Sequence, residues 1–253
     1  QANNPDEYLG YGIPDYFDAH TALSIPVIHA IHLDIKVFLE GPFQGSAMTG
    51  LSTGLIPLNQ PYNAPPINYN GIEQVLSIPG SEIVDWIYLE LRDTTDAALA
   101  GEETVVARRA AFLKTDGNVV DLDGASMVSF NLPVSNNLFL VIKHRNHLGI
   151  ISSDALTNDG SDMYAYDFTT NVESVVGGSA GYKEIAPNVF GLVSGDANAD
   201  GLINNDDLSL SWATAAGESV YHAGDFNLDG QIDNPDKDDH WWPNTSFSEQ
   251  IPD

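Results

Sequence analysis

Two twelve-residue segments near the C-terminus repeat one pattern of oxygen-bearing side chains. The first covers residues 196–207 and the second covers residues 225–236, so their starts lie 29 residues apart. In both segments Asp or Asn occupies positions 1, 3, 5, 9 and 12, Gly occupies position 6 and Ile occupies position 8. Gly at position 6 permits a sharp turn with positive φ. This spacing predicts that each segment folds back on itself and brings its oxygen atoms together.

The chemistry of this spacing is that of the EF-hand calcium loop. Positions 1, 3 and 5 supply side-chain oxygens, position 7 a backbone carbonyl, position 9 a contact through water and position 12 a closing carboxylate. The sequence therefore predicts two bound Ca²⁺ ions. The predicted ligands are Asp196, Asn198, Asp200, Leu202, Asn204 and Asp207 in the first loop, and Asp225, Asn227, Asp229, Gln231, Asp233 and Asp236 in the second. The alternative is a pair of polar turns that bind no metal.

The repeat continues beyond the predicted ligands. Trp212 and Trp241 each follow the closing Asp by five residues, and Gly195 and Gly224 stand where an entering helix would end. This arrangement resembles the dockerin type I repeat, in which two loop–helix calcium motifs pair back to back. We expect the two Trp side chains to pack the repeat onto itself or onto the rest of the chain. Partner binding through these aromatic residues remains an alternative.

The charge of the chain excludes some classes of function. The formal net charge is −27, from 36 acidic and nine basic residues, and residues 195–253 hold 13 of the acids but one base. Nucleic-acid binding requires clustered Lys and Arg, so no nucleic-acid partner is expected. No run of 18 apolar residues occurs, so no membrane span is predicted.

Several features favour a secreted protein of the cell surface or extracellular space. The chain has no cysteine, so a buried core, metal ions or assembly must provide its rigidity. Weak calcium loops fill outside the cell, where calcium is abundant, rather than in the cytosol. The first residue is Gln1 rather than Met, which suggests a processed N-terminus.

Hydrophobic patterning predicts three regions. Residues 1–30 form an extended arm and candidate donor strand, residues 31–192 a β-sandwich and residues 193–253 a dockerin-like module with both calcium loops. Alternating apolar residues predict strands near 31–39, 83–92, 103–113, 118–121, 126–132 and 137–144. Helical periodicity is nearly absent before residue 205. The expected fold is mainly β, an antiparallel sandwich of roughly seven to nine strands followed by a small α/loop module.

A further resemblance covers about residues 31–245. It is carried by the segments Lys36–Phe43 (KVFLEGPF), Val84–Asp93 (VDWIYLELRD) and Lys143–Gly149 (KHRNHLG), together with the calcium repeat. These segments resemble the C-terminal β-sandwich and dockerin-like repeat of large secreted proteins of Bacteroidota. The resemblance implies a secreted or cell-surface location and no enzyme activity.

Other clusters have simpler interpretations. His144 and His147 would face opposite sides of a continuous strand, so we expect a structural role in a turn with Arg145 and Asn146, with a site role as the alternative. The segment Asp121–Gly124 is expected to form a hairpin turn rather than a metal loop. A third ion could involve Asp154, Asp159 and Asp162, and glycans could attach at Asp93–Thr95 or Asn244–Ser246.

Three functions remain open. The first is a non-enzymatic, calcium-stabilised structural protein that assembles head-to-tail into a homopolymeric filament through its N-terminal arm. The alternative is a docking or adhesion module that binds a cohesin-like or cell-surface partner in polysaccharide utilisation. The third is a polysaccharide hydrolase that uses paired carboxylates. No Gly-x-Ser-x-Gly motif, cysteine or phosphate-binding loop supports an enzyme.

Overall fold

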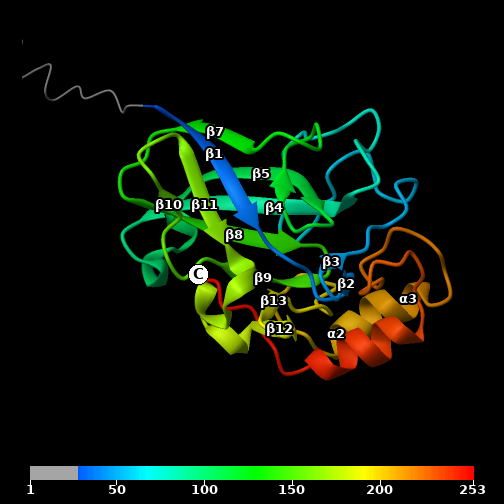
Figure 1. Ribbon diagram of the computed structural model, residues 1–253. Coiled ribbons are helices and arrows are strands. Elements are labelled where there is room, and N and C mark those ends of the chain that lie inside the picture. The colour runs from blue at the N-terminus through cyan, green and yellow to red at the C-terminus, as the bar shows by residue number, and fades with distance from the viewer. Residues whose placement is uncertain (1–27) are drawn as a thin grey trace, which may run out of the picture.

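The computed structural model describes residues 28–253 and shows a mainly β protein built from several sheets. Two larger sheets lie against each other (Figure 1). The four-stranded sheet has the order β10 (Thr157–Asn158), β11 (Met163–Asp167), β1 (His29–Lys36), β7 (Val128–Leu132). The five-stranded sheet has the order β6 (Val119–Val120), β5 (Val105–Lys114), β4 (Ile83–Thr94), β8 (Asn137–His144), β9 (His147–Ile151).

The strands predicted at 83–92 and 137–144 are confirmed, but the expectation of a fully antiparallel sandwich needs a correction. Strands β1 and β11 run parallel, with Leu33 opposite Tyr164. A parallel pair requires a long crossover, which the chain between the two strands supplies. Strand β1 begins at His29, two residues before the predicted start of the sandwich. The rest of the predicted arm, residues 1–27, lies outside the described residues.

One hydrophobic core fills the space between the two sheets. Along β1, Ile31, Leu33 and Ile35 are buried while His32 and Asp34 are exposed, which is the alternation of a strand with one covered face. In the opposite sheet, strand β4 is buried on both faces, since Ile87 and Leu89 alternate with Trp86. The Trp86 ring packs on Phe112 of β5 with centroids 4.2 Å apart, and its indole N–H donates to the Pro57 carbonyl in the loop after β3.

Smaller elements complete the chain. Two hairpins join β2 (Phe43–Gln44) to β3 (Ala47–Met48) and β12 (Tyr182–Ala186) to β13 (Val189–Leu192). Short helical turns follow the strands at η1 (Ala97–Leu99), η2 (Glu102–Thr104), η3 (Phe168–Thr170), η4 (Val172–Ser174) and η5 (Gly178–Ala180). The loop after β3 covers the outer face of β4, where the Tyr62 hydroxyl donates a hydrogen bond to the Trp86 carbonyl at 2.8 Å.

The C-terminal region forms two helical segments, each directly after one predicted calcium loop. The first comprises α2 (Asn205–Asp207), η6 (Leu208–Trp212) and α3 (Ala213–Ala215), and the second η7 (Asp236–Trp241) and η8 (Trp242–Asn244). They lie side by side at one end of the sandwich (Figure 1). A second buried cluster, with Ile203, Phe226 and Trp241 around Leu148 of β9, joins this region to the five-stranded sheet.

Candidate metal centre

The two predicted calcium loops follow the same backbone path. At loop position 4, Ala199 and Leu228 adopt positive φ angles of 56° and 57°, and at position 6 Gly201 and Gly230 adopt 81° and 86°. Residues other than Gly rarely adopt positive φ, so its occurrence at one loop position in both copies identifies a shared turn. The repeated spacing in the sequence therefore corresponds to a repeated local fold.

The closing residue at position 12 makes the same hydrogen bonds in both loops. Asp207 is fully buried, and its carboxylate accepts from the backbone N–H groups of Ala197, Asn198 and Asn204 at 2.8, 3.2 and 2.8 Å. The equivalent bonds to Asp236 come from the backbone N–H groups of Phe226, Asn227 and Asp233, at 2.7, 3.0 and 2.9 Å. Each closing carboxylate thus holds the start of its loop against the end.

The first residue of the first loop has an unused acceptor. Asp196 is 2% exposed, and its Oδ2 accepts a hydrogen bond from the Gly201 backbone N–H at 3.1 Å. Its Oδ1 is buried and has no hydrogen-bond partner among the described residues. Burial, together with the nearby Asp207 carboxylate, raises the pKa of Asp196 to about 8. A buried carboxylate oxygen of this kind requires a proton or a cation as its partner.

The first residue of the second loop is also a buried carboxylate. Both oxygens of Asp225 accept backbone hydrogen bonds, from Asp229 and Gly230, each at 3.1 Å. Burial raises its pKa to about 7, although the nearby Arg145 opposes this rise. The two loops therefore share a frame but differ in charge, because a guanidinium lies beside the second.

Positions 3 and 5 form consecutive short turns. The Asn198 side-chain oxygen accepts from the Asp200 backbone N–H at 2.9 Å, and Asp200 accepts from the Leu202 N–H at 2.9 Å. In the second loop Asn227, Asp229 and Gln231 repeat these bonds at 2.9 and 2.8 Å. Such side-chain turns hold short oxygen side chains along the inner curve of a loop.

These residues fit a hard cation that prefers oxygen ligands. Across residues 28–253, no group of three or more His, Cys, Asp or Glu side chains is positioned to hold a metal ion by itself. The predicted shells contain three Asp side chains in the first loop and four in the second, and all of these carboxylates but Asp233 instead accept hydrogen bonds from backbone N–H groups of their own loops. Asparagine side chains and the backbone carbonyls of Leu202 and Gln231 would supply the rest of each predicted shell. Calcium binding at the twelve predicted positions remains a prediction, supported by the loop geometry and the partnerless oxygen of Asp196.

Each repeat contributes a Trp side chain to the loop of the other repeat. The Trp212 indole N–H donates to the Asp233 carbonyl at 2.8 Å, and the Trp241 indole N–H donates to the Asn204 carbonyl at 3.0 Å. Asp233 and Asn204 both occupy loop position 9, so the two hydrogen bonds are equivalent. This reciprocal pairing confirms the expectation that both Trp side chains pack within the repeat.

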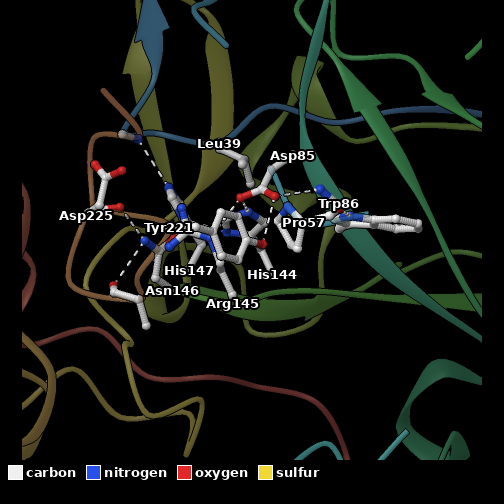
Figure 2. Close-up of polar contacts among 12 residues, drawn as sticks. Leu39, Pro57, Asp85, Trp86, His144, Arg145, Asn146, His147, Tyr221 and Asp225 are labelled. Atoms are coloured by element: carbon white, nitrogen blue, oxygen red, sulfur yellow. Dashed lines mark hydrogen bonds and ion pairs between the residues drawn. The ribbon is translucent and has the colours of Figure 1, made fainter. Parts of the chain in front are cut away.

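The hairpin between β8 and β9 anchors the second loop to the sandwich. The Asn146 side-chain amide donates to the carbonyls of Ala223 and Asp225 at 3.1 and 2.6 Å (Figure 2). On the other side of the loop, any side chain at Gly41 would overlap the Phe226 carbonyl, so this close approach requires glycine. The position of the second loop is therefore set by backbone contacts with the sandwich.

A buried charged pair lies at the same junction (Figure 2). The Asp85 carboxylate is fully buried and accepts from Arg145 Nε at 2.8 Å and from the Tyr221 hydroxyl at 2.9 Å. Burial opposes the ionisation of Asp85, but Arg145 and His144 hold its pKa below the ordinary value. Arg145 also donates to the His222 carbonyl and lies 4.3 Å from the centroid of the Tyr221 ring. This one side chain therefore connects strand β4 to the link between the calcium loops.

The two histidines of the hairpin do not face opposite sides, because β8 ends at His144 and a two-residue turn returns the chain to His147. Their Nδ1 atoms lie 3.2 Å apart. Burial lowers the pKa of both imidazoles, which favours the neutral forms. His147 Nε2 accepts from the Gly41 backbone N–H at 3.2 Å. The predicted structural role of this hairpin is confirmed by these contacts.

Sequence reasoning missed one acid beside the first loop. Glu249 comes from the C-terminal segment, where its backbone N–H donates to the Gly201 carbonyl at 2.8 Å and its side chain pairs with Lys143 at 2.8 Å. Its negative charge contributes to the raised pKa of Asp196. No spacing rule connects residue 249 to a loop that ends at 207, so the sequence carried no signal for it.

The other acidic clusters form local turns. Asp123 accepts hydrogen bonds from the Ala125 and Ser126 backbone N–H groups, and Asp121 pairs with Arg109 at 2.6 Å, as expected for a hairpin turn. Asp159 accepts from the Ser161 backbone N–H at 3.0 Å. A third ion at Asp154, Asp159 and Asp162, and a glycan at Asp93–Thr95, remain untested predictions. The glycan expected at Asn244–Ser246 conflicts with the structure, because Asn244 is fully buried and its Nδ2 donates to Glu40, Ser194 and His240.

The raised pKa of Asp196 leads to a prediction for the metal-free protein. The folded state holds the Asp196 proton more tightly than the unfolded state, so its ionisation destabilises the fold increasingly as the pH rises from about 4 to about 8. An Asp196→Asn variant stays neutral and should melt at a higher temperature than wild type near pH 8. The gain should shrink near pH 5. Calorimetry of both proteins after metal removal measures the difference, with Asp206→Asn as the control; a gain that grows towards acid pH would contradict the prediction.

Comparisons with known proteins add little to this geometry. No protein-family model matches the chain, and no curated protein matches it. Among solved structures, the chain is similar to a type II cohesin–X-dockerin complex from Acetivibrio cellulolyticus that carries a mutant N-terminal interface. The identity is 13%, the TM-score is 0.34, and the match covers 89% of this chain and 97% of that chain. At this TM-score the likeness does not support an assignment of fold or function.

Proposed function

We propose that this chain is a non-enzymatic, calcium-stabilised module that acts outside the cell in protein docking or adhesion. The observation that carries the proposal is the shared geometry of the two loops, with the buried and partnerless Oδ1 of Asp196. Calcium would supply the missing partner and neutralise the acids gathered in each loop. Because the loops contact buried clusters rather than a reactive group, the ions would act by stabilising the repeat and its attachment to the sandwich.

The charged cleft beside the first loop supports a role without catalysis. This cleft has a volume of about 450 Å³ and is lined by Arg92, Arg108 and Lys143. Each of these cations pairs with a carboxylate, at Glu90 or Glu249, over 2.7 to 2.8 Å. General acid–base catalysis requires a carboxyl group that is free to exchange a proton with substrate. Glu90 and Glu249 are instead held by ion pairs. The other acids of the lining are Glu102, which pairs with Arg108, and Asp200, a predicted calcium ligand that accepts a hydrogen bond from the Leu202 backbone N–H.

The outer surface of the repeat offers apolar contacts to a protein partner. Leu210 of the first helical segment is 66% exposed and Trp242 of the second is 68% exposed. Aromatic and large aliphatic residues are frequent anchors of protein interfaces. None of the helices in residues 28–253 is long and apolar enough to cross a membrane. The acidic charge agrees with a setting rich in calcium.

The test is capture of cell-surface proteins by the immobilised chain, in calcium and after chelation. We expect an identified protein to bind in calcium only, and to be lost with Leu210→Asp or Trp242→Ala. Leu76→Asp, at an exposed apolar residue outside the repeat, serves as the matched control and should retain binding. Equal capture by all variants would exclude the repeat as the docking surface.

A second candidate function is head-to-tail assembly through the N-terminal arm. It is favoured by one edge of the four-stranded sheet, where β7 pairs with β1 on one side and has no other strand partner among residues 28–253. An open edge can accept a strand from a second copy of the chain. Sedimentation of the protein with and without residues 1–27 tests this candidate. Polymers that persist without the arm would rule it out.

A further inference from the structure

Three side chains from distant parts of the chain meet where β12 contacts the second helical segment. The Lys183 Nζ lies 2.9 Å from Oδ1 of Asn244 and 2.6 Å from Oε1 of Glu40. The other carboxylate oxygen of Glu40 accepts a hydrogen bond from Asn244 Nδ2 at 2.7 Å. One carboxylate therefore contacts both the amine nitrogen of the lysine and the amide nitrogen of the asparagine.

The Asn244 carboxamide is held in one orientation. Its residue is fully buried, and its Nδ2 is surrounded by acceptors: Glu40 Oε2, the Ser194 carbonyl at 2.9 Å and the His240 carbonyl at 2.6 Å. A flipped carboxamide would place Oδ1, which cannot donate a hydrogen bond, against these acceptor oxygens. The carbonyl group is thus directed at the lysine amine, and its carbon is one bond beyond the contacted oxygen.

The surroundings partly bury the amine and hold the carboxylate in place. The side chains of Lys183 and Glu40 are 25% and 13% exposed, and the Phe247 ring centroid lies 5.7 Å from the amine. Glu40 Oε2 is fixed by hydrogen bonds from the Ser194 backbone N–H and hydroxyl, at 3.0 and 3.1 Å. A carboxylate in contact with the amine can serve as its general base, and fixed proximity raises the rate of attack.

We propose that Lys183 and Asn244 condense into an intramolecular isopeptide bond, with Glu40 as the catalytic residue. Glu40 takes a proton from the Lys183 ammonium, and the neutral amine attacks Cγ of Asn244. A new C–N bond forms and the carbonyl becomes tetrahedral. Glu40 then delivers this proton to Nδ2 and relays a second proton from the newly bonded Lys183 nitrogen to the departing nitrogen, the bond from Cγ to Nδ2 breaks, and the carbonyl is restored.

The reaction balances without an oxidant or any other reagent. Of the three ammonium hydrogens of Lys183, one stays on the new amide nitrogen and two leave with the departing nitrogen, which is released as ammonium. Glu40 ends as a carboxylate, as it began. The product is a secondary amide between the two side chains, lighter than the encoded chain by one molecule of ammonia.

The bond would enclose both calcium loops within one covalent ring. Lys183 precedes the first loop and Asn244 follows the second, so residues 184–243 would lie between the linked positions. Strand β12 would then be joined covalently to the end of η8. Unfolding of the repeat, or pulling on it, could no longer separate these two elements. This inference is independent of calcium binding and of any docking partner.

Mass spectrometry of the purified, folded chain tests the proposal. The mass is read on the linked tryptic peptides rather than on the intact chain, because cyclisation of an N-terminal Gln also removes one ammonia; the linked pair should be lighter than its two peptides by one ammonia. Trypsin cleaves after unmodified Lys and Arg, so a linked Lys183 should resist cleavage, and peptide 146–237 should remain joined to peptide 238–253. Lys143 and Glu249 form an ion pair of similar length without a carboxamide and serve as the internal control; cleavage after Lys143 should be complete.

Variants identify the roles of the two reacting groups. Lys183→Arg retains the charge but lacks the nucleophile, and Glu40→Gln lacks the carboxylate; both should yield unlinked tryptic peptides only. A wild-type protein with normal cleavage after Lys183 and no linked peptides would overturn the proposal, whatever the folding of the variants. A Glu40→Gln protein that still yields the linked peptides would overturn the assignment of Glu40.

Discussion

Replacing Arg145 with alanine is expected to lower the free energy of unfolding by about 3 to 5 kcal/mol. The substitution leaves the Asp85 carboxylate fully buried with its cationic partner removed. It also removes the hydrogen bond to the His222 carbonyl and the contact with the Tyr221 ring. Urea unfolding at saturating calcium measures the loss.

Arg109→Ala is the matched control for this experiment. Arg109 pairs with Asp121, but both side chains are partly exposed, at 27% and 19%. Solvent screens such a pair, so its loss should lower the free energy of unfolding by less than about 1 kcal/mol. Equal losses in the two variants would show that the Asp85–Arg145 pair does not hold the junction.

Calcium is expected to stabilise the protein by about 2.7 kcal/mol for each loop when free calcium is a hundredfold above the dissociation constant. The reason is mass action, since the ion binds the folded loops and the unfolded chain provides no equivalent site. Asp200→Ala and Asp229→Ala should each remove about half of this calcium-dependent increase. Each variant takes away the position 5 carboxylate of one loop. Thermal unfolding with and without calcium measures the increase for each protein.

Asp206→Ala separates loss of a ligand from loss of a charge. Asp206 is exposed and occupies position 11 of the first loop, where no ligand is predicted. The Asp206→Ala variant should retain the full calcium-dependent increase in stability, although its net charge changes by the same amount as in Asp200→Ala. If all three variants respond to calcium as wild type does, the loops are not metal sites and the proposed function loses its main support.

The metal and the inferred covalent bond would act on the same part of the molecule in different ways. Calcium would hold each loop closed, and its effect would disappear on chelation. An amide between Lys183 and Asn244 would persist through chelation and keep η8 attached to β12. Calcium removal would then loosen the loops without releasing the end of the repeat. Module attachment and loop closure can therefore be tested separately.

Local patterns in the sequence predicted the parts of this protein that depend on neighbouring residues. Alternation along Ile31, Leu33 and Ile35 identified a strand with one buried face, because side chains of a strand point to opposite sides in turn. The twelve-residue spacing identified both loops, since position 6 fixes the turn and the other positions follow from it. Packing of Trp212 and Trp241 within the repeat was one of the two expected arrangements, because both residues follow their loops at the same spacing.

Only the tertiary structure decided which distant residues meet. The parallel pairing of β1 with β11, the burial of Arg145 against Asp85 and the meeting of Glu40 with Lys183 and Asn244 all join segments far apart in the chain. No periodicity links such residues, because their proximity depends on how the sheets stack and where the C-terminal repeat docks. The sequence by itself therefore determined the main strands up to residue 144 and the two loops, but not strands β9 to β13. The packing of the repeat against the sandwich determined the chemistry of the junction between them.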